Sequence, residues 1–151
     1  MRCPKCNGPI KLYGKSPVCT NPCNTPLALV ETMKEFSIAI EKTAVLAKDS
    51  PGFIVNRVAR HYYLESLKLI EEGSTDISSI DKLLKSAGFK MGPFELMDLI
   101  GVDINLAVSK SIYQAFENEI RFEPSIIQEN LVKEGNLGKK TGKGFYDYKK
   151  E

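Results

Sequence analysis

Apolar residues recur at helical spacing along most of this chain, between short segments rich in proline and glycine. The first such pattern is "LALVETMKEFSIAIEKTAVLAK", before which Thr25 can act as an N-cap and Pro26 suits the first helical position. Its apolar positions include Leu29, Val30, Met33, Phe36 and Ile40. The pattern predicts a helix near residues 26–48.

A second helix is predicted from the stretch "DSPGFIVNR", residues 49–57. Ser50 can serve as its N-cap and Pro51 as its first residue, and Gly73 is the expected stop. We expect the apolar run at positions 53–55 to enter the core.

Two strong polar groups, Asn56 and Arg57, follow that run directly. The Asn56 amide can be hydrogen-bonded within its own domain or can face a binding cleft. Arg57 lies early in the predicted helix and can pair with a carboxylate such as that of Asp98. His61, the only histidine, is expected to be an ordinary surface or interface residue.

Four further helices are predicted after the second one. Their expected bounds are Asp76 to Gly88, Pro93 to Gly101, residues 103–118 and residues 124–134. The glycine-rich tail "GNLGKKTGKGFYDYKKE" is expected to be a loop that docks Phe145 and Tyr146 onto the body. Because no convincing strand pattern occurs after residue 24, the sequence predicts an all-α fold of several helices.

Residues 1–24 differ from the rest of the chain. They are rich in proline, glycine and asparagine, they are too short to build a core, and they hold all four cysteines in two close pairs. We therefore predict a small N-terminal segment over residues 1–24 and a helical domain over residues 25–151.

The two cysteine pairs suit a structural zinc ion in a knuckle or ribbon. Zinc prefers four soft ligands in a tetrahedron, and a close pair of thiolates at each end of a short hairpin can supply them. Since no ligand position would remain open, the metal would hold a segment that cannot fold alone. Redox-active or incidental cysteines and disulfides are the alternatives. The predicted ligands are Cys3, Cys6, Cys19 and Cys23.

The composition narrows the range of partners. The 151 residues include 21 basic and 19 acidic side chains, and this balance is too even for the strong field of a nonspecific nucleic-acid binder. No apolar run approaches the roughly 20 residues that cross a bilayer, and "MRCPKCNGPI" lacks the apolar core of a signal peptide. The sequence therefore predicts a soluble, cytoplasmic protein without membrane or nucleic-acid partners.

The lysines of the tail invite comparison with a phosphate-binding P-loop. That motif needs four residues between its two glycines and a Ser or Thr after its lysine. Here three residues separate Gly138 from Gly142, and Gly144 follows the lysine, so a nucleotide triphosphatase is not expected. The basic side chains can contact the phosphates of an acidic ligand or simply face solvent. They are Lys139, Lys140 and Lys143.

Three segments together resemble the C-terminal helical domain of the 3-hydroxyacyl-CoA dehydrogenases, including the 3-hydroxybutyryl-CoA enzymes. They are "DSPGFIVNR", "GFKMGPFELMDLIGVD" and "NLGKKTGKGFYDY", and they occur in the order and spacing of the family. The resemblance covers about residues 49–148. Just before it, "NPCNTPLALVE" is similar to the tract that closes the cofactor domain of the family.

The resemblance implies a part in the NAD-dependent oxidation of the 3-hydroxyl group of an acyl-CoA. By resemblance, this domain supplies homodimer contacts and one wall of the substrate cleft. Asn56 matches the family asparagine that helps to hold the reacting groups, and Glu31 matches the glutamate of the His–Glu pair through "LVE". Both are therefore candidate catalytic residues, and acyl-CoA is the expected ligand.

Two features of the family do not occur in this sequence. The position that matches the catalytic histidine, three residues before Asn21-Pro22, is Val18, and His61 lies where the family usually has Pro or Ala. The G-x-G-x-x-G turn of a dinucleotide-binding fold is also missing, and the residues before the first helix are too few for such a fold. The isolated chain is therefore predicted to be inactive, with NAD reaching it only through a partner.

Three hypotheses follow. In the first, the chain is a shortened dehydrogenase relative with a zinc knuckle in place of the NAD-binding domain, and it binds acyl-CoA or completes the site of a separate NAD-binding subunit. In the second, it is a zinc-knuckle interaction module that uses the helical domain only as a dimeric scaffold. In the third, it is an active NAD-dependent enzyme through an unrecognised site. Binding of acyl-CoA and of NAD distinguishes the three.

Overall fold

The structure, a computed structural model, describes the backbone at residues 10–13, 16–19 and 27–148, and the side chains from residue 29 onward. The chain divides into two compact units, residues 1–53 and 54–151. The described elements of the first unit are two strands and one helix, whereas those of the second unit are all helical. The predicted all-α fold is confirmed for the body of the chain.

The first unit contains a small antiparallel hairpin. Strand β1 (Ile10–Tyr13) pairs with strand β2 (Ser16–Cys19), with Ile10 opposite Cys19 at one end of the ladder. Helix α1 (Leu27–Ala39) contacts β2. The boundary between the two units therefore falls after α1, whereas the sequence places the start of the helical domain at residue 25.

Helix α1 ends at Ala39, so the predicted helix end near residue 48 is wrong. The two hydrogen bonds of a Schellman ending close the helix: Lys42 N donates to Ser37 O over 2.8 Å, and Glu41 N donates to Ile38 O over 2.9 Å. The left-handed residue at this ending is Glu41, with a φ of 57°. Since the position is neither glycine nor asparagine, the sequence carries no signal for the stop.

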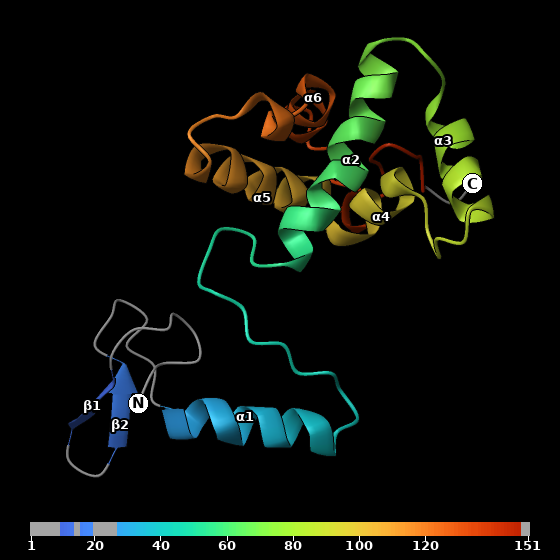
Figure 1. The fold of residues 1–151 in the computed structure, drawn as a ribbon. Coiled ribbons are helices and arrows are strands. Elements are labelled where there is room, and N and C mark those ends of the chain that lie inside the picture. The colour runs from blue at the N-terminus through green and yellow to red at the C-terminus, as the bar shows by residue number, and fades with distance from the viewer. Residues whose placement is uncertain (1–9, 14–15, 20–26, 149–151) are drawn as a thin grey trace. The chain divides into compact units, whose positions relative to one another are not determined.

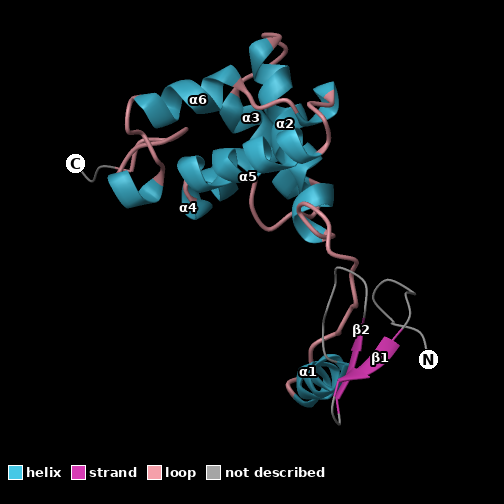
Figure 2. Ribbon diagram, turned by 90° about the vertical axis from the view of Figure 1, so that its left-hand side faces the viewer, coloured by secondary structure: helices cyan, strands magenta, loops and turns pink. Residues whose placement is uncertain are grey.

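The second unit is a bundle of five α-helices with two short 3-10 turns among its described residues (Figure 1). They are α2 (Val55–Glu71), α3 (Ile77–Ser86), α4 (Pro93–Ile100), α5 (Val102–Ala115), η1 (Ile120–Phe122), α6 (Ile126–Lys133) and η2 (Lys139–Thr141). Figure 2 shows this unit built from helices and loops alone. Helix α4 is central, because it contacts α2, α3, α5 and η2. The four helices predicted after Gly73 are confirmed with small shifts of their ends.

Two of the predicted helix signals act as expected. The Asp76 carboxylate accepts a hydrogen bond from Ser79 N over 3.0 Å and so caps α3. The bonds from the Ser79 hydroxyl and amide also lower the pKa of Asp76. Gly73 and Gly88 follow α2 and α3 with φ of 69° and 105°, and these left-handed conformations end the helices.

Helix α2 begins at Val55, four residues later than the prediction from Pro51. Gly52 and Phe53 have φ of 73° and 47°, so a turn precedes the helix, and Phe53 N donates to Ser50 O over 2.9 Å. The predicted cap at Ser50 is wrong, because the residue that precedes the first turn is Ile54, which makes no side-chain capping bond.

The apolar run at positions 53–55 does not enter the core, contrary to the prediction. Val55 is 74% exposed, and Phe53 and Ile54 are exposed as well. The delayed helix start is the physical reason, since it leaves the run on a turn and on the first helical position instead of on a packed face.

The core lies around α4. Its fully buried side chains Phe94 and Met97 pack with Tyr63 and Leu67 of α2 and with Ile80 of α3. The tail also packs here: Phe145 and Tyr146 lie against this cluster, and the Phe145 ring meets Phe94 edge-on, with 5.0 Å between ring centroids. The prediction that the tail docks its aromatic residues onto the body is confirmed.

Candidate functional site

The first turn of α2 carries the two polar groups that the sequence singles out. Asn56 is exposed, and Arg57 is half-buried with its guanidinium carbon 4.3 Å from the centroid of the Phe116 ring. This is a cation–π contact between α2 and the end of α5. The predicted pairing of Arg57 with Asp98 is wrong, because Asp98 is buried and binds the tail instead.

An apolar groove of about 570 Å³ lies between α2 and the loop before α4. Its lining includes Val58, Ala59, Tyr62, Phe89, Lys90 and Met91. Tyr62 fixes the loop wall: its hydroxyl donates to Met91 O over 2.7 Å, and its ring stacks on Phe89 with 4.9 Å between centroids. The groove therefore has a preformed apolar surface with one lysine in its lining.

Asn56 lies close to this groove along the helix. It precedes Ala59, a lining residue, by three positions, so the two side chains share one side of α2 about one turn apart. Burial raises the pKa of Tyr62, and the nearby Asp81 carboxylate raises it further, so the phenol remains a hydrogen-bond donor at neutral pH. The arrangement can hold an apolar chain, with an amide near one wall and a cation on the other.

The lysines of the tail have different surroundings. Lys140 donates to both carboxylate oxygens of Asp103, over 2.6 and 2.7 Å, and this bond lowers the pKa of Asp103. The Lys139 ammonium lies 5.5 Å from the centroid of the Tyr148 ring. The Lys143 side chain is exposed. Lys140 is therefore tied to the start of α5, and the side chains of all three lysines are exposed.

The glycine-rich tail is held by the buried carboxylate of Asp98. Its oxygens accept hydrogen bonds from Phe145 N, Tyr146 N and the Tyr148 hydroxyl, over 2.9, 3.0 and 2.9 Å. A Cβ at Gly138 would meet the Asp98 backbone, and one at Gly144 would meet its carboxylate. The glycines of "GNLGKKTGKGF" thus allow close packing against α4, which gives this motif a structural explanation.

A second buried carboxylate, Asp81 of α3, holds the start of α4. It accepts hydrogen bonds from Phe94 N and Glu95 N, each over 3.0 Å, and from the Tyr146 hydroxyl over 2.8 Å. It thereby binds the positive end of the helix from a neighbouring helix. Gly92 lies so close that a Cβ there would meet this carboxylate. This capping role of Asp81 is not apparent in the sequence.

A buried polar network around Arg60 was also missed from the sequence. The Arg60 Nη1 atom donates to the carbonyl and side-chain oxygens of Asn105, over 3.0 and 3.1 Å, and to the Ser109 hydroxyl over 2.8 Å. Gln128 Nε2 donates to the same Asn105 side chain over 2.9 Å. Burial lowers the pKa of Arg60. The network joins α2, α5 and α6, and nothing in the sequence separates Arg60 from an exposed arginine.

The remaining candidates lie elsewhere. His61 is half-buried and stacks on Phe122 with 5.3 Å between ring centroids, and its interpretation as an ordinary surface or interface residue stays a prediction. Glu31 is exposed on α1, in the first unit, whereas Asn56 belongs to the second. Their pairing in one catalytic site stays a prediction.

The predicted zinc ligands fall mostly outside the described residues. Cys3, Cys6 and Cys23 lie outside them, and Cys19 is described only as the last backbone position of β2. Within residues 29–148, whose side chains the structure describes, no three or more His, Cys, Asp or Glu groups gather to hold a metal ion. Zinc binding therefore stays a prediction.

No helix in the described part of the chain is long and apolar enough to cross a membrane.

The fold and its motifs define a class of helical domain. Residues 52–148 match the family described as 3-hydroxyacyl-CoA dehydrogenase, C-terminal domain. The chain therefore belongs to the 3-hydroxyacyl-CoA dehydrogenase family, and the resemblance of its three motifs is confirmed.

Named relatives agree with this assignment. The chain is 48% identical over 128 residues to 3-hydroxyadipyl-CoA dehydrogenase of Escherichia coli K12, over 84% of this chain and 27% of that protein. It is 41% identical over 120 residues to human mitochondrial hydroxyacyl-coenzyme A dehydrogenase, over 79% of this chain and 38% of the human protein. A crystal structure of 3-hydroxybutyryl-CoA dehydrogenase from Escherichia coli K12 has a TM-score of 0.79 at 47% identity, over 85% of this chain and 27% of that one. The chain thus spans 27–38% of the length of these relatives.

Proposed function

We propose that this chain provides the acyl-CoA-binding and dimerisation domain of a 3-hydroxyacyl-CoA dehydrogenase, of the 3-hydroxybutyryl-CoA type, in cytoplasmic fatty acyl-CoA metabolism. The observation that carries the proposal is the apolar groove near Asn56, in a chain that belongs to this family. A groove of about 570 Å³ has the size of a small-molecule site.

The groove and its neighbours offer complementary chemistry for an acyl-CoA. The apolar wall of Val58, Ala59 and Phe89 suits an acyl chain, and burying that chain would drive binding. The Asn56 amide would donate a hydrogen bond to an oxygen of the acyl group. Lys90 and the exposed Lys143, with Lys139 and Lys140 beside it in the chain, would attract the phosphates of coenzyme A.

The chain alone would not carry out the oxidation. Hydride transfer needs NAD, and the sequence has neither a G-x-G-x-x-G turn nor a histidine at position 18. A separate NAD-binding subunit would supply the cofactor and the catalytic base, while Asn56 and Glu31 of this chain would complete the site. The helical domain would thus act as one part of a divided enzyme.

A homodimer through the helical unit is supported by exposed apolar side chains. Leu69 of α2 and Leu83 of α3 are exposed and line a second groove of about 370 Å³ between these helices. Covering such side chains from water favours association.

The N-terminal segment, residues 1–24, would bind a structural zinc ion. The hairpin supports this, because Cys19 ends β2 opposite Ile10, which follows Cys6 by four residues in the sequence. This register places the end of β2 beside the start of β1. Four zinc ligands drawn from both cysteine pairs need these two chain segments to lie side by side. The hairpin also favours a second candidate function, a zinc-knuckle interaction module on a dimeric helical scaffold.

Isothermal titration calorimetry of the full chain with acetoacetyl-CoA and with NAD tests the function. We expect acetoacetyl-CoA to bind and NAD not to bind. Val58→Arg places a cation in the groove wall and should weaken acetoacetyl-CoA binding by about tenfold or more. Ile120→Arg makes the same change at an exposed site outside the groove and should leave the affinity within about twofold.

The opposite outcomes are equally clear. Absence of acetoacetyl-CoA binding would contradict the proposal and favour the interaction module, whereas NAD binding by this chain would show a cofactor site of its own. Elemental analysis of the reduced protein tests the metal: we expect one zinc per chain, lost in a Cys19→Ser variant. A folded, reduced protein without zinc would contradict the metal site.

A further inference from the structure

The loop between α3 and α4 is fixed at both of its ends. At its start, Phe89 N donates to a carbonyl of α3 over 3.2 Å, and at its end the first turn of α4 is bonded to Asp81. Between these ends, and within the described part of the chain, the Tyr62 hydroxyl is the only group that is hydrogen-bonded to Lys90 or Met91. The middle of the loop therefore depends on Tyr62 for its attachment to α2.

Tyr62 holds the loop with both its hydroxyl and its ring. The hydroxyl donates to Met91 O over 2.7 Å, and the ring stacks on Phe89 with 4.9 Å between ring centroids. Burial raises the pKa of Tyr62, and the Asp81 carboxylate raises it further, so the hydroxyl keeps the proton that it donates. The side chain thus fixes the spacing between α2 and the loop.

This spacing is the width of the apolar groove. Val58 and Ala59 of α2 line one side of the groove, and Phe89 and Met91 of the loop line the other. An acyl chain between the two sides would gain dispersion energy from both. Because that energy falls steeply with distance, a gap of about 0.5–1 Å on one side forfeits about a quarter to a half of it. The position of the loop therefore determines how much affinity each methylene group of a ligand adds.

We propose that Tyr62 is a positioning residue that sets the acyl-chain selectivity of this groove, because it holds Phe89 and Met91 at contact distance from a chain lying on α2. This inference rests on the proposed function, in which the groove binds the acyl group of an acyl-CoA. It names the ligand class of the groove as straight, apolar acyl chains. Tyr62 acts through the loop, so it affects the dependence of affinity on chain length and not the affinity for coenzyme A itself.

Isothermal titration calorimetry of the full chain with butyryl-CoA, hexanoyl-CoA and free coenzyme A tests this role. Burial of one methylene group is worth about fourfold in affinity, so the wild-type chain should bind hexanoyl-CoA about 15-fold more tightly than butyryl-CoA. Tyr62→Phe keeps the stacked ring and removes only the hydrogen bond. In this variant the hexanoyl-to-butyryl affinity ratio should fall to about fivefold. The affinity for free coenzyme A should stay within about twofold.

A matched control removes a tyrosine hydroxyl outside the groove. Tyr113 of α5 is half-buried and lines a different groove together with Gln114 and Glu129. Tyr113→Phe should leave the hexanoyl-to-butyryl affinity ratio within about twofold of its wild-type value. Circular dichroism and thermal unfolding check that both variants are folded.

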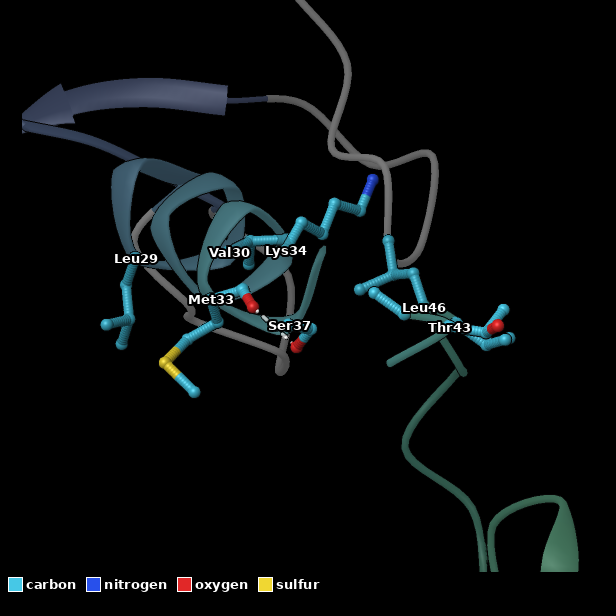
Figure 3. A pocket seen from close by; sticks show the side chains of 9 residues that line it. Leu29, Val30, Met33, Lys34, Ser37, Thr43 and Leu46 are labelled. Atoms are coloured by element: carbon cyan, nitrogen blue, oxygen red, sulfur yellow. Dashed lines mark hydrogen bonds between the residues drawn. The ribbon is translucent and has the colours of Figure 1, made fainter. Parts of the chain in front are cut away.

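A second measurement needs no variant, because three methionines have distinct surroundings. Met91 lines the groove and Met97 is fully buried in the core. Met33 extends from α1 of the first unit, where it lines another apolar groove, of about 470 Å³ (Figure 3). In the wild-type chain, hexanoyl-CoA should shift the methyl NMR signal of Met91 more than those of Met33 and Met97. Free coenzyme A should shift the Met91 signal less than hexanoyl-CoA does.

Several outcomes would overturn the inference. An unchanged hexanoyl-to-butyryl affinity ratio in Tyr62→Phe, or an equal fall of that ratio in Tyr113→Phe, would do so. A comparable loss of affinity for free coenzyme A in Tyr62→Phe would show a general effect of the substitution, with the same consequence. A methyl shift at Met33 and not at Met91 would place the acyl chain on the first unit instead.

The same titrations separate this inference from the proposed function. If the wild-type chain binds neither acyl-CoA, the proposed function fails and this inference fails with it. If the wild-type chain binds both and the affinity ratio is unchanged in Tyr62→Phe, only the role of Tyr62 is contradicted.

Discussion

The carboxylate of Asp98 in α4 accepts a hydrogen bond from the backbone amide of Phe145 in the tail, with 2.9 Å between Oδ1 and N. The two residues are 47 positions apart in the sequence. Asp98 is 1% exposed, so its buried oxygens need this bond and those from Tyr146 and Tyr148 in place of water. Polar bonding thus acts together with apolar packing to hold the glycine-rich tail on the body.

Replacing Asp98 with asparagine should destabilise the helical unit. Asparagine has an NH2 group in place of one carboxylate oxygen. That group would face the backbone amides and the hydroxyl that donate to Asp98 in the wild-type chain, so at least one buried hydrogen bond would be lost. We expect the free energy of unfolding in urea to fall by about 2–4 kcal/mol. Glu123→Gln, at an exposed carboxylate, is the matched control and should change it by less than about 0.5 kcal/mol. Equal effects of the two substitutions would contradict the role assigned to Asp98.

Gly144→Ala should be costly for a steric reason. The added Cβ would meet the Asp98 carboxylate and the Cα of Gly138, so the tail would have to move away from α4. We expect a loss of about 2–3 kcal/mol in thermal or urea unfolding. Gly135→Ala is the comparison: its φ of 75° is strained for alanine but the space around it is open, so it should cost only about 1 kcal/mol. A smaller loss at Gly144 than at Gly135 would argue against the close packing.

The phenol of Tyr148 should ionise at unusually high pH. Burial raises its pKa first, and the hydrogen bond to Asp98 raises it further, because a phenolate would face a carboxylate. The stability that this neutral phenol contributes is present below the ordinary tyrosine pKa of about 10 and is lost as the pH rises above it. Ultraviolet titration of tyrosinate should show Tyr148 ionising earlier in the Asp98→Asn variant. An unchanged titration curve would count against this coupling.

Lys140 should control the ionisation of Asp103. Its hydrogen bond lowers the pKa of this carboxyl in the folded chain, so the pair contributes stability above the unfolded aspartate pKa of about 3.9 and loses it as the pH falls through the folded value. Lys140→Ala should raise the pKa of Asp103, measured by NMR of the carboxyl carbon. Lys143→Ala is the control and should leave that pKa in place. Because both partners are partly exposed, the effect on stability should be small.

The sequence predicted most helices of the second unit because their signals are local. The Asp76 cap, Pro93 at the first position of α4 and the stops at Gly73 and Gly88 each act within one turn of the chain. The errors have local causes as well. Helix α1 ends at Ala39, because Glu41 two residues later takes a left-handed conformation that no glycine announces, and two positive φ angles delay the start of α2.

The candidate site was only partly visible in the sequence. Asn56 was found through the family motif and its role stays a prediction, whereas no periodicity indicates the apolar groove whose lining begins two positions later on the same helix. The groove forms because Tyr62 of α2 binds Met91 of a loop 29 positions later. The predicted partner of Arg57 was wrong. Its guanidinium makes a cation–π contact, and an aromatic ring can stabilise a cation as a carboxylate does.

By itself, the sequence determined the family, the helical class of the body and the positions of most helix ends, since motif order, apolar spacing and capping residues are properties of short segments. Only the tertiary structure decided that Asp81 and Asp98 are buried bonding centres, that Arg60 joins three helices, and that Met33 and Phe36 of α1 are exposed. The physical reason is that the burial of a charge and the exposure of an apolar side chain depend on which segments, distant in the sequence, pack together. Residue spacing along the chain does not determine that packing.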